Sequence, residues 1–212
     1  MGIHEKELNL YYNQGQFNHP ERIGYVMKLI RSLRPLTEAE WRAWYLTHVH
    51  DMVYIEQLAA EMCHTIPSEL RISQDDCLEY ILDVMFHRTF CGYDREKAAL
   101  ALLRERVCPD IREAPSVWDT RYFIDFFVHK RKCRMVGIQL KPASFYAGGY
   151  QDTVSITEKM ERFQQKYDAF AYVLTYQESG QGTIQLDPAA IKEIQEHLDV
   201  TQSDKKNPVA QE

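Results

Sequence analysis

The chain has 212 residues, of which 45% are hydrophobic, enough for one substantial core in one domain or in one domain with an appended lobe. The net charge of -6 excludes a protein that coats nucleic acid indiscriminately, because such proteins carry a broad excess of positive charge. The charge is compatible with an enzyme that needs positive side chains only where phosphates lie.

The apolar runs, cysteines and histidines of the sequence also indicate where the protein is located and whether it has a zinc site. The chain has no long uncharged apolar run and no secretory signal at its start, so we expect no membrane association and a cytoplasmic location. Five widely spaced cysteines are an odd number, which indicates reduced thiols rather than a disulfide framework. His48 and His50 form a close pair without a second ligand cluster, so an ordinary helix-end pair is preferred over a zinc site.

The first half of the chain is predicted to be helical. Residues 22–34 carry apolar side chains at intervals of three and four, which predicts one amphipathic helix. A second helix is expected over residues 37–63, opened by a capping box of Thr37 and Glu40 and broken near His48. Its aromatic residues recur at helical spacing, and burial in the core is preferred over base stacking for them: Trp41, Trp44 and Tyr45.

Two further helices are expected before the composition changes. Ser73 and Asp76 offer a cap for a third helix over residues 78–88. Gly92 is expected to separate this helix from a fourth one over residues 94–107, which ends shortly before a proline.

The segment after Pro115 has strand composition. Residues 121–128 are aromatic and β-branched, and residues 133–141 form a second such run that ends at Pro142. A polar turn separates the two runs, so the pair is predicted to be a β-hairpin.

The remaining segments alternate between helix and strand patterns. Residues 153–168 return to helical spacing, residues 169–176 indicate a buried strand, and residues 179–186 indicate a turn with a short strand. A helix over residues 188–198 has proline in its first turn. The polar residues 201–212 are expected to form a disordered tail.

The order of these elements predicts the fold class. Helices followed by a β-β-α-β unit and a final helix indicate an α/β or α+β fold with a mixed central sheet flanked by helices. We expect a single domain over residues 1–200, with a mainly helical half at about 20–108 and a core at about 119–187 that carries the chemistry.

Three side chains of the predicted hairpin could serve phosphodiester chemistry. Asp125 is expected inside the first strand, where an uncompensated carboxylate would be costly to bury. Gln139 and Lys141 stand two residues apart on the second strand and therefore share one face. Hydrolysis of a phosphodiester needs a metal ion, carboxylates that hold it and a group that activates water, and the hairpin would bring such groups together.

These residues resemble the PD-(D/E)xK nuclease superfamily, whose signature is an acidic residue on one strand and (D/E)xK on the next. The match is Asp125 with Gln139, Leu140 and Lys141. Within this superfamily, residues 20–145 resemble MjaI-type type II restriction endonucleases. Three stretches carry the likeness: RIGYVMKLI followed by LTEAEWRAWYL, then HRTFCGYDRE, then IDFFVHKRKCRMVGIQLKPASF.

The resemblance implies a restriction-endonuclease-like fold and a Mg²⁺-dependent active site. Asp125 would coordinate Mg²⁺, and Lys141 would orient or deprotonate the attacking water. Gln139 departs from the pattern, because its amide oxygen can bind a hard cation but brings no negative charge. Glu96 is therefore expected as an additional catalytic metal ligand, with Glu79 as the second choice.

Two further features of the second half have open interpretations. Asp119 is an alternative to Asp125 as the strand acid, although it is expected near the strand entrance. The Gly148 and Gly149 pair is expected to be a turn or a place of close approach to DNA. A basic cluster in the hairpin turn is expected to bind DNA phosphate or to remain a solvated turn: His129, Lys130, Arg131, Lys132 and Arg134.

The resemblance implies a type II restriction endonuclease that cuts double-stranded DNA at a short, palindromic site. Such an enzyme is expected to be a homodimer, because two active sites related by a two-fold axis are needed to cut both strands. A cognate DNA methyltransferase would be its genetic partner in a restriction-modification system. Two alternatives stay open: a repair nuclease or junction resolvase on the same core, and a non-catalytic DNA-binding protein in which Gln139 marks a degenerate site.

Overall fold

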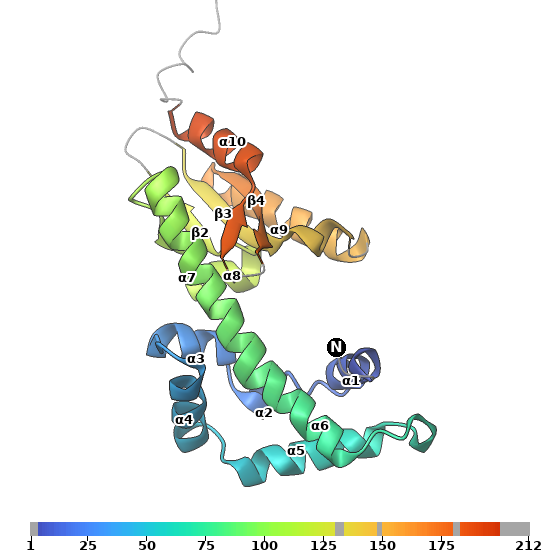
Figure 1. The fold of residues 1–212 in the computed structure, drawn as a ribbon. Helices are drawn as coiled ribbons and strands as arrows, with labels where there is room; N and C mark the ends of the chain where they lie inside the picture. The colour runs from blue at the N-terminus through green and yellow to red at the C-terminus, as the bar shows by residue number, and fades with distance from the viewer. Residues whose placement is uncertain (1–3, 130–133, 148–149, 180–182, 200–212) are drawn as a thin grey trace, which may run out of the picture. The chain divides into compact units, whose positions relative to one another are not determined.

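The computed structural model describes residues 4–129, 134–147, 150–179 and 183–199 (Figure 1). The chain divides into two compact units, Met1–Asp94 and Arg95–Glu212. The predicted tail and the glycine pair at 148–149 lie outside the described residues, as does most of the basic hairpin turn. No helix in the described ranges is both long enough and apolar enough to cross a bilayer.

The first unit is built from helices. In chain order they are α1 (Glu5–Gln14), α2 (Pro20–Ile23), α3 (Val26–Leu33), α4 (Glu38–His48), α5 (Met52–Thr65), the short 3-10 helix η1 (Ser68–Leu70), α6 (Gln74–Leu82), the π-helical turn η2 (Asp83–Arg88) and the start of α7 (Thr89–Arg106). Trp41 and Tyr45 are fully buried in the core of this unit, as predicted, and Trp44 is half-buried against it. Their polar atoms are satisfied, because Trp41 Nε1 donates to the Met85 carbonyl at 3.0 Å and Tyr45 Oη donates to the Ile23 carbonyl at 2.7 Å.

The predicted single helix over 22–34 is wrong. Gly24 has a φ of 73°, which favours glycine, and it separates α2 from α3. Thr37 caps α4 as predicted, since its side chain accepts from the Glu40 N–H at 3.2 Å. The Glu40 carboxylate accepts from the Leu36 N–H at 2.7 Å instead of closing the box on Thr37. The break near His48 is confirmed, because α4 ends at that residue.

The predicted separation at Gly92 is also wrong. The capping box of Ser73 and Asp76 opens α6 as expected, but the helical path then continues through η2 into α7. Thr89 Oγ1 donates to the Val84 carbonyl at 2.8 Å across the wider turn of η2. A lone glycine in a helix costs only about 1 kcal/mol, which the rest of a long helix outweighs.

Cysteines within the described ranges are free thiols, as expected: Cys63, Cys77, Cys91 and Cys108. Burial raises the pKa of Cys77 to about 12, with smaller contributions from Cys63 and Asp76. This thiol is therefore neutral and unreactive at ordinary pH.

The second unit contains a five-stranded mixed sheet, which confirms the predicted fold class. The strands are β1 (Arg112–Glu113), β2 (Phe126–Val128), β3 (Val136–Pro142), β4 (Phe170–Glu178) and β5 (Ile184–Leu186), in that spatial order. Among the described strands, β3 and β4 are parallel neighbours and the other neighbouring pairs are antiparallel. The helices of this unit are the remainder of α7, then α8 (Ser116–Tyr122), the 3-10 helix η3 (Ala143–Ala147), α9 (Tyr150–Tyr167) and α10 (Pro188–Asp199).

Each face of the sheet is covered by its own helices. Leu103 of α7 and Ile194 of α10 are buried with Ile138 and other strand residues on one face, which we call the α7 face. Phe163 of α9 is buried on the other, which we call the α9 face. A Cβ on Gly137 would lie 2.7 Å from the Phe163 ring, so β3 and α9 approach closely there.

The predicted strand over 121–128 is partly wrong. Its first residues belong to α8, and Phe123 ends that helix with a φ of 54°. Asp119 lies within α8 rather than at a strand entrance. Asp125 comes just before β2, but its backbone already joins the sheet, because its N–H donates to the Ile138 carbonyl at 2.9 Å. The predicted pairing of the hairpin is confirmed by the antiparallel register of β2 and β3.

Candidate active site

Asp125 and Gln139 are joined directly by their side chains. Gln139 Nε2 donates to Asp125 Oδ2 at 2.5 Å. The Leu140 backbone N–H donates to the same carboxylate oxygen at 2.8 Å. Two donors, one of them from the rigid backbone of β3, hold the Asp125 carboxylate in a fixed orientation beside that strand.

Gln139 has an unsatisfied oxygen inside the protein. The residue is only 3% exposed, and no donor among the described residues reaches its Oε1 atom. Rotating the amide by half a turn would place Oε1 against the Asp125 carboxylate, where two acceptors would meet, so the hydrogen bonding fixes the orientation. An unsatisfied buried acceptor costs about 1–3 kcal/mol, which a cation or a donor from a ligand would recover.

Lys141 lies on the same face of β3 as Gln139. Side chains of a strand alternate, and Ile138 and Leu140 belong to the α7 face, so Gln139 and Lys141 belong to the α9 face. Lys141 Nζ is 5.9 Å from the centre of the Phe123 ring and 5.8 Å from that of Phe145. The ammonium group is thus held near two aromatic rings at the carboxyl end of β3.

Glu96 lies at the same end of the sheet on a different face. It precedes the buried Ala99 and Leu100 by three and four residues, which places it on the sheet-facing stripe of α7. The pKa of Tyr176 on β4 is raised by burial first, and then by the Glu178 and Glu96 carboxylates. Tyr176 is the register partner of Pro142, so Glu96 is near the carboxyl ends of β3 and β4 while its helix covers the α7 face.

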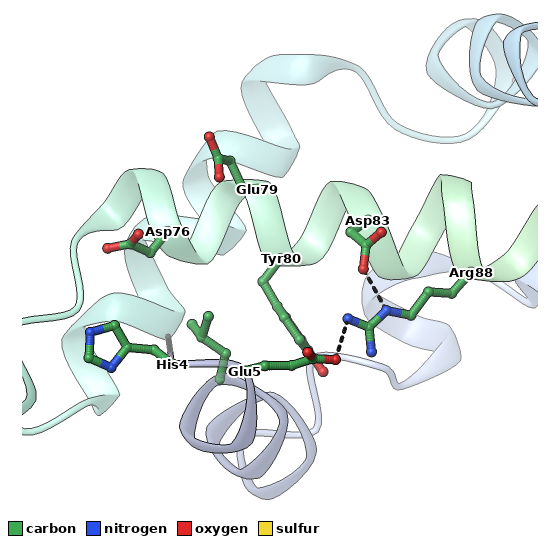
Figure 2. Close-up of a pocket in the computed structure, with 8 residues that line it drawn as sticks. His4, Glu5, Asp76, Glu79, Tyr80, Asp83 and Arg88 are labelled. Carbon is green, nitrogen blue, oxygen red and sulfur yellow. Dashed lines mark hydrogen bonds and ion pairs between the residues drawn. The ribbon is translucent and has the colours of Figure 1, made fainter. Parts of the chain in front are cut away.

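Glu79, the second choice for a metal ligand, belongs to the helical unit. It lines a pocket of about 500 Å³ there with several charged neighbours (Figure 2). Arg88 donates to Asp83 at 2.5 Å and to Glu5 at 2.9 Å, which ties α1 to η2. The charges at that end of the pocket therefore serve the packing of the helical unit.

The donor set around Asp125 fits a hard divalent cation. Carboxylate and amide oxygens are the ligand atoms that Mg²⁺ takes, and the Gln139 Oε1 atom is buried without a donor beside a fixed carboxylate. In the described ranges no three acidic, cysteine or histidine side chains converge on one metal position. Asp125 and Gln139 are therefore the residues that would hold such a cation.

A comparison with protein families identifies the chain. The model of the MjaI restriction endonuclease family matches residues 5–200. The chain belongs to the MjaI restriction endonuclease family. Restriction endonucleases are nucleases that act on DNA, so membership gives both the class of enzyme and its substrate. No curated protein and no solved structure matches the chain.

One cation beside the site of this restriction endonuclease escaped the sequence analysis. Lys159 of α9 places its Nζ atom 3.7 Å from the centre of the Phe123 ring. Its position is indicated by helical spacing, because Ile156, Met160 and Phe163 are buried on the same side of α9. The sequence signal for Lys159 is a helix that follows β3 in the chain and packs on the face of β3 that carries Gln139 and Lys141.

The basic cluster of the enzyme is described only in part. Arg134 forms an ion pair with Asp168 at 2.5 Å and lies 5.3 Å from the centre of the Phe170 ring, so it has partners within its own unit. Lys130, Arg131 and Lys132 lie outside the described residues.

Proposed function

We propose that the chain is a type II restriction endonuclease that hydrolyses both strands of double-stranded DNA at a short palindromic site, with Mg²⁺ as cofactor. The observation that carries the active site is the Asp125 carboxylate fixed beside the buried, unsatisfied oxygen of Gln139. Lys141 stands on the same face of β3, where a lysine can act on a phosphate held by that pair.

Each side chain has a distinct role in this proposal. Asp125 and the Oε1 atom of Gln139 hold the cation. When bound, Mg²⁺ polarises the scissile phosphate as a Lewis acid. Lys141 orients the attacking water and stabilises the negative charge that develops on the phosphate. The Leu140 N–H keeps the carboxylate in position throughout.

A third ligand is needed because Gln139 is neutral. We propose Glu96 for this role, since it lies at the same end of β3 and β4 as Lys141. The DNA phosphate is the other candidate, and it would be favoured by the position of α7 on the opposite face of the sheet. The Glu96→Gln variant separates the two candidates. If Glu96 is the ligand, the Mg²⁺ concentration that gives half-maximal cleavage should rise strongly. If the DNA phosphate is the ligand, this concentration should not change.

The central test is cleavage of unmethylated phage DNA by the purified protein in the presence of Mg²⁺. Discrete fragments are expected from the wild type, and none from Asp125→Ala or Lys141→Ala. Lys192→Ala is the matched control, because Lys192 lies on α10, its side chain is 78% exposed, and among the described residues it pairs with Glu196 one helix turn away. Unaltered cutting by both site variants would overturn the assignment of the site.

The same assay separates the alternative functions. Preferential cleavage of branched DNA would indicate a junction resolvase, and DNA binding without any Mg²⁺-dependent cleavage would indicate a protein with a degenerate site. Protection of the substrate by methylation at the cut sequence would support a partner methyltransferase. A two-fold homodimer in sedimentation experiments with DNA would agree with a palindromic site.

A further inference from the structure

We propose that Lys159 is a second phosphate-binding residue of this active site, which contacts the DNA backbone next to the phosphate held by Asp125 and Gln139. The inference rests on the proposed function. It starts from the α9 face of the sheet, where α9 lies close against β3 because Gly137 has no side chain in the way. This approach brings a residue of α9 to the strand that carries Gln139 and Lys141.

Phe123 connects the two lysines. The Lys159 ammonium is 3.7 Å from the centre of its ring, and the Lys141 ammonium is 5.9 Å from the same point. Attraction between an ammonium group and the face of a ring holds both cations near this position. Phe123 stands two residues before Asp125, so the ring and the carboxylate leave the same short segment of chain.

The position of Phe123 is fixed by the end of α8. Its N–H donates to the Asp119 carbonyl at 3.0 Å, and its φ of 54° turns the chain sharply toward β2. A bulky residue in this backbone region costs about 1–3 kcal/mol and persists where the surroundings demand it. Here the turn directs the ring toward Lys159.

Neither ammonium group has a carboxylate partner among the described residues. The nearby Glu158 and Arg162 of α9 pair with each other, at 3.7 Å. Lys141 and Lys159 are both half-buried, so part of their hydration is lost without an ion pair in return. Two such cations beside Phe123, two residues before Asp125, form a site for an anion, and a DNA strand supplies adjacent phosphates.

The charges of Asp125 and the two lysines predict that DNA and the metal ion bind cooperatively. Asp125 is joined to Gln139, and the positive charges of Lys141 and Lys159 near Phe123 should oppose binding of a divalent cation to that pair in the absence of DNA, whether or not Glu96 also serves as a ligand. DNA phosphates neutralise the lysines and add oxygens for the cation. Metal ion and DNA should therefore strengthen each other's binding, and Lys159 should favour DNA while opposing the metal ion in the free protein.

The test measures DNA binding by fluorescence anisotropy with Ca²⁺ in place of Mg²⁺, for wild type, Lys159→Met, Lys159→Arg and the control Lys192→Met. Lys159→Met keeps the apolar stem and should weaken binding about tenfold. The slope of log affinity against log salt concentration should become shallower by about 0.9, which corresponds to the loss of one phosphate contact. Lys159→Arg should restore affinity, and the control should match wild type.

A second measurement uses the protein without DNA. Mn²⁺ titration, followed by quenching of tryptophan fluorescence, should show tighter binding in Lys159→Met than in wild type, because a repelling charge is gone. A merely structural role would not move this affinity upward. If thermal melting shows that the Met variant is unfolded, Lys159→Gln replaces it, and weaker DNA binding and tighter Mn²⁺ binding are expected for that variant.

The outcomes keep the two proposals apart. If the wild type cuts DNA while the Met and Gln variants bind DNA and Mn²⁺ as the wild type does, the role of Lys159 is wrong and the endonuclease stands. If the wild type cuts no DNA, the proposed function fails by itself. The Lys159 role is then upheld or overturned by the binding and salt measurements alone.

Discussion

The two units of the molecule treat their polar side chains in opposite ways. In the pocket of the helical unit, Arg88 pairs with Asp83 and Glu5. On the α9 face of the sheet unit, the buried oxygen of Gln139 and two lysine ammonium groups have no such partners among the described residues. Charged groups that pair with each other, as Arg88 does, contribute to stability, whereas buried or half-buried polar groups without partners can bind a ligand.

One group in the helical unit resembles Gln139 at first sight. Tyr12 is 2% exposed and its hydroxyl has no partner among the described residues. Burial, with a smaller effect of Tyr80, raises its pKa, so the phenol stays neutral. It packs edge-on against Tyr80 at 5.5 Å between ring centres, as a core side chain does. The Tyr12 hydroxyl lies among aromatic rings, whereas the Gln139 amide is bonded to a carboxylate, so only the surroundings of Gln139 suit a metal ion.

The largest contrast between the units is expected for carboxylates. Asp125→Asn keeps the shape of the side chain and removes its charge, so cleavage should fall by about 10²–10⁴-fold in single-turnover assays. Asp83→Asn is the counterpart in the helical unit and should leave the cleavage rate within about twofold of wild type. Equal losses in both variants would show that the two units do not differ in role.

Gln139→Glu sharpens the contrast by adding the missing charge. The new carboxylate would replace the 2.5 Å donor to Asp125 by a repelling neighbour, so the metal-free protein should melt at a lower temperature. A bound divalent cation neutralises the pair, and Mn²⁺ should raise the melting temperature more than in wild type. If Mn²⁺ leaves the melting temperature of this variant unchanged, the cation binds elsewhere.

Two glycines test packing in the two units. Gly137→Ala places a methyl group 2.7 Å from the Phe163 ring and 2.9 Å from Ile124, and should cost about 1–3 kcal/mol of unfolding free energy. Gly92→Ala meets nothing within 4 Å in the interior of α7, and should add about 0.5–1 kcal/mol. Denaturant unfolding measures both, and effects of the same sign would contradict the packing described.

The smallest effect is expected in the pocket of the helical unit. Arg88→Met removes the bonds to Asp83 and Glu5, which lie at a partly exposed surface, so stability should change by no more than about 1 kcal/mol. DNA affinity and cleavage should stay at wild-type values. A loss of DNA affinity without a loss of stability would give this pocket a function.

The sequence was sufficient for features determined by local patterns. The alternation along β3 put Gln139 and Lys141 on one face, and the hairpin joined Gln139 to Asp125, as their hydrogen bond shows. The caps at Thr37 and Ser73 followed from short polar motifs. These features need only neighbours in the chain or one turn between strands.

Features that depend on tertiary contacts could not be read from the sequence. The aromatic run at 121–128 predicts a strand from residue 121, but Tyr122 packs with Trp118 against Phe163 of α9, and both belong to α8. Gly92 marks no boundary, because the surrounding helix tolerates it. Helical spacing indicates the side of α9 on which Lys159 lies, but only the packing of α9 on β3 brings its ammonium group to the Phe123 ring.

The left-handed backbone at Phe123 is strained, but the side chain at this position contacts both lysines. Glycine at this position would relax the backbone, yet it would remove the ring that Lys141 and Lys159 share. The ring also packs against the core on the α9 face, so its loss in Phe123→Gly should offset the relief of the backbone. One replacement at this turn should therefore lower DNA cleavage without raising the melting temperature.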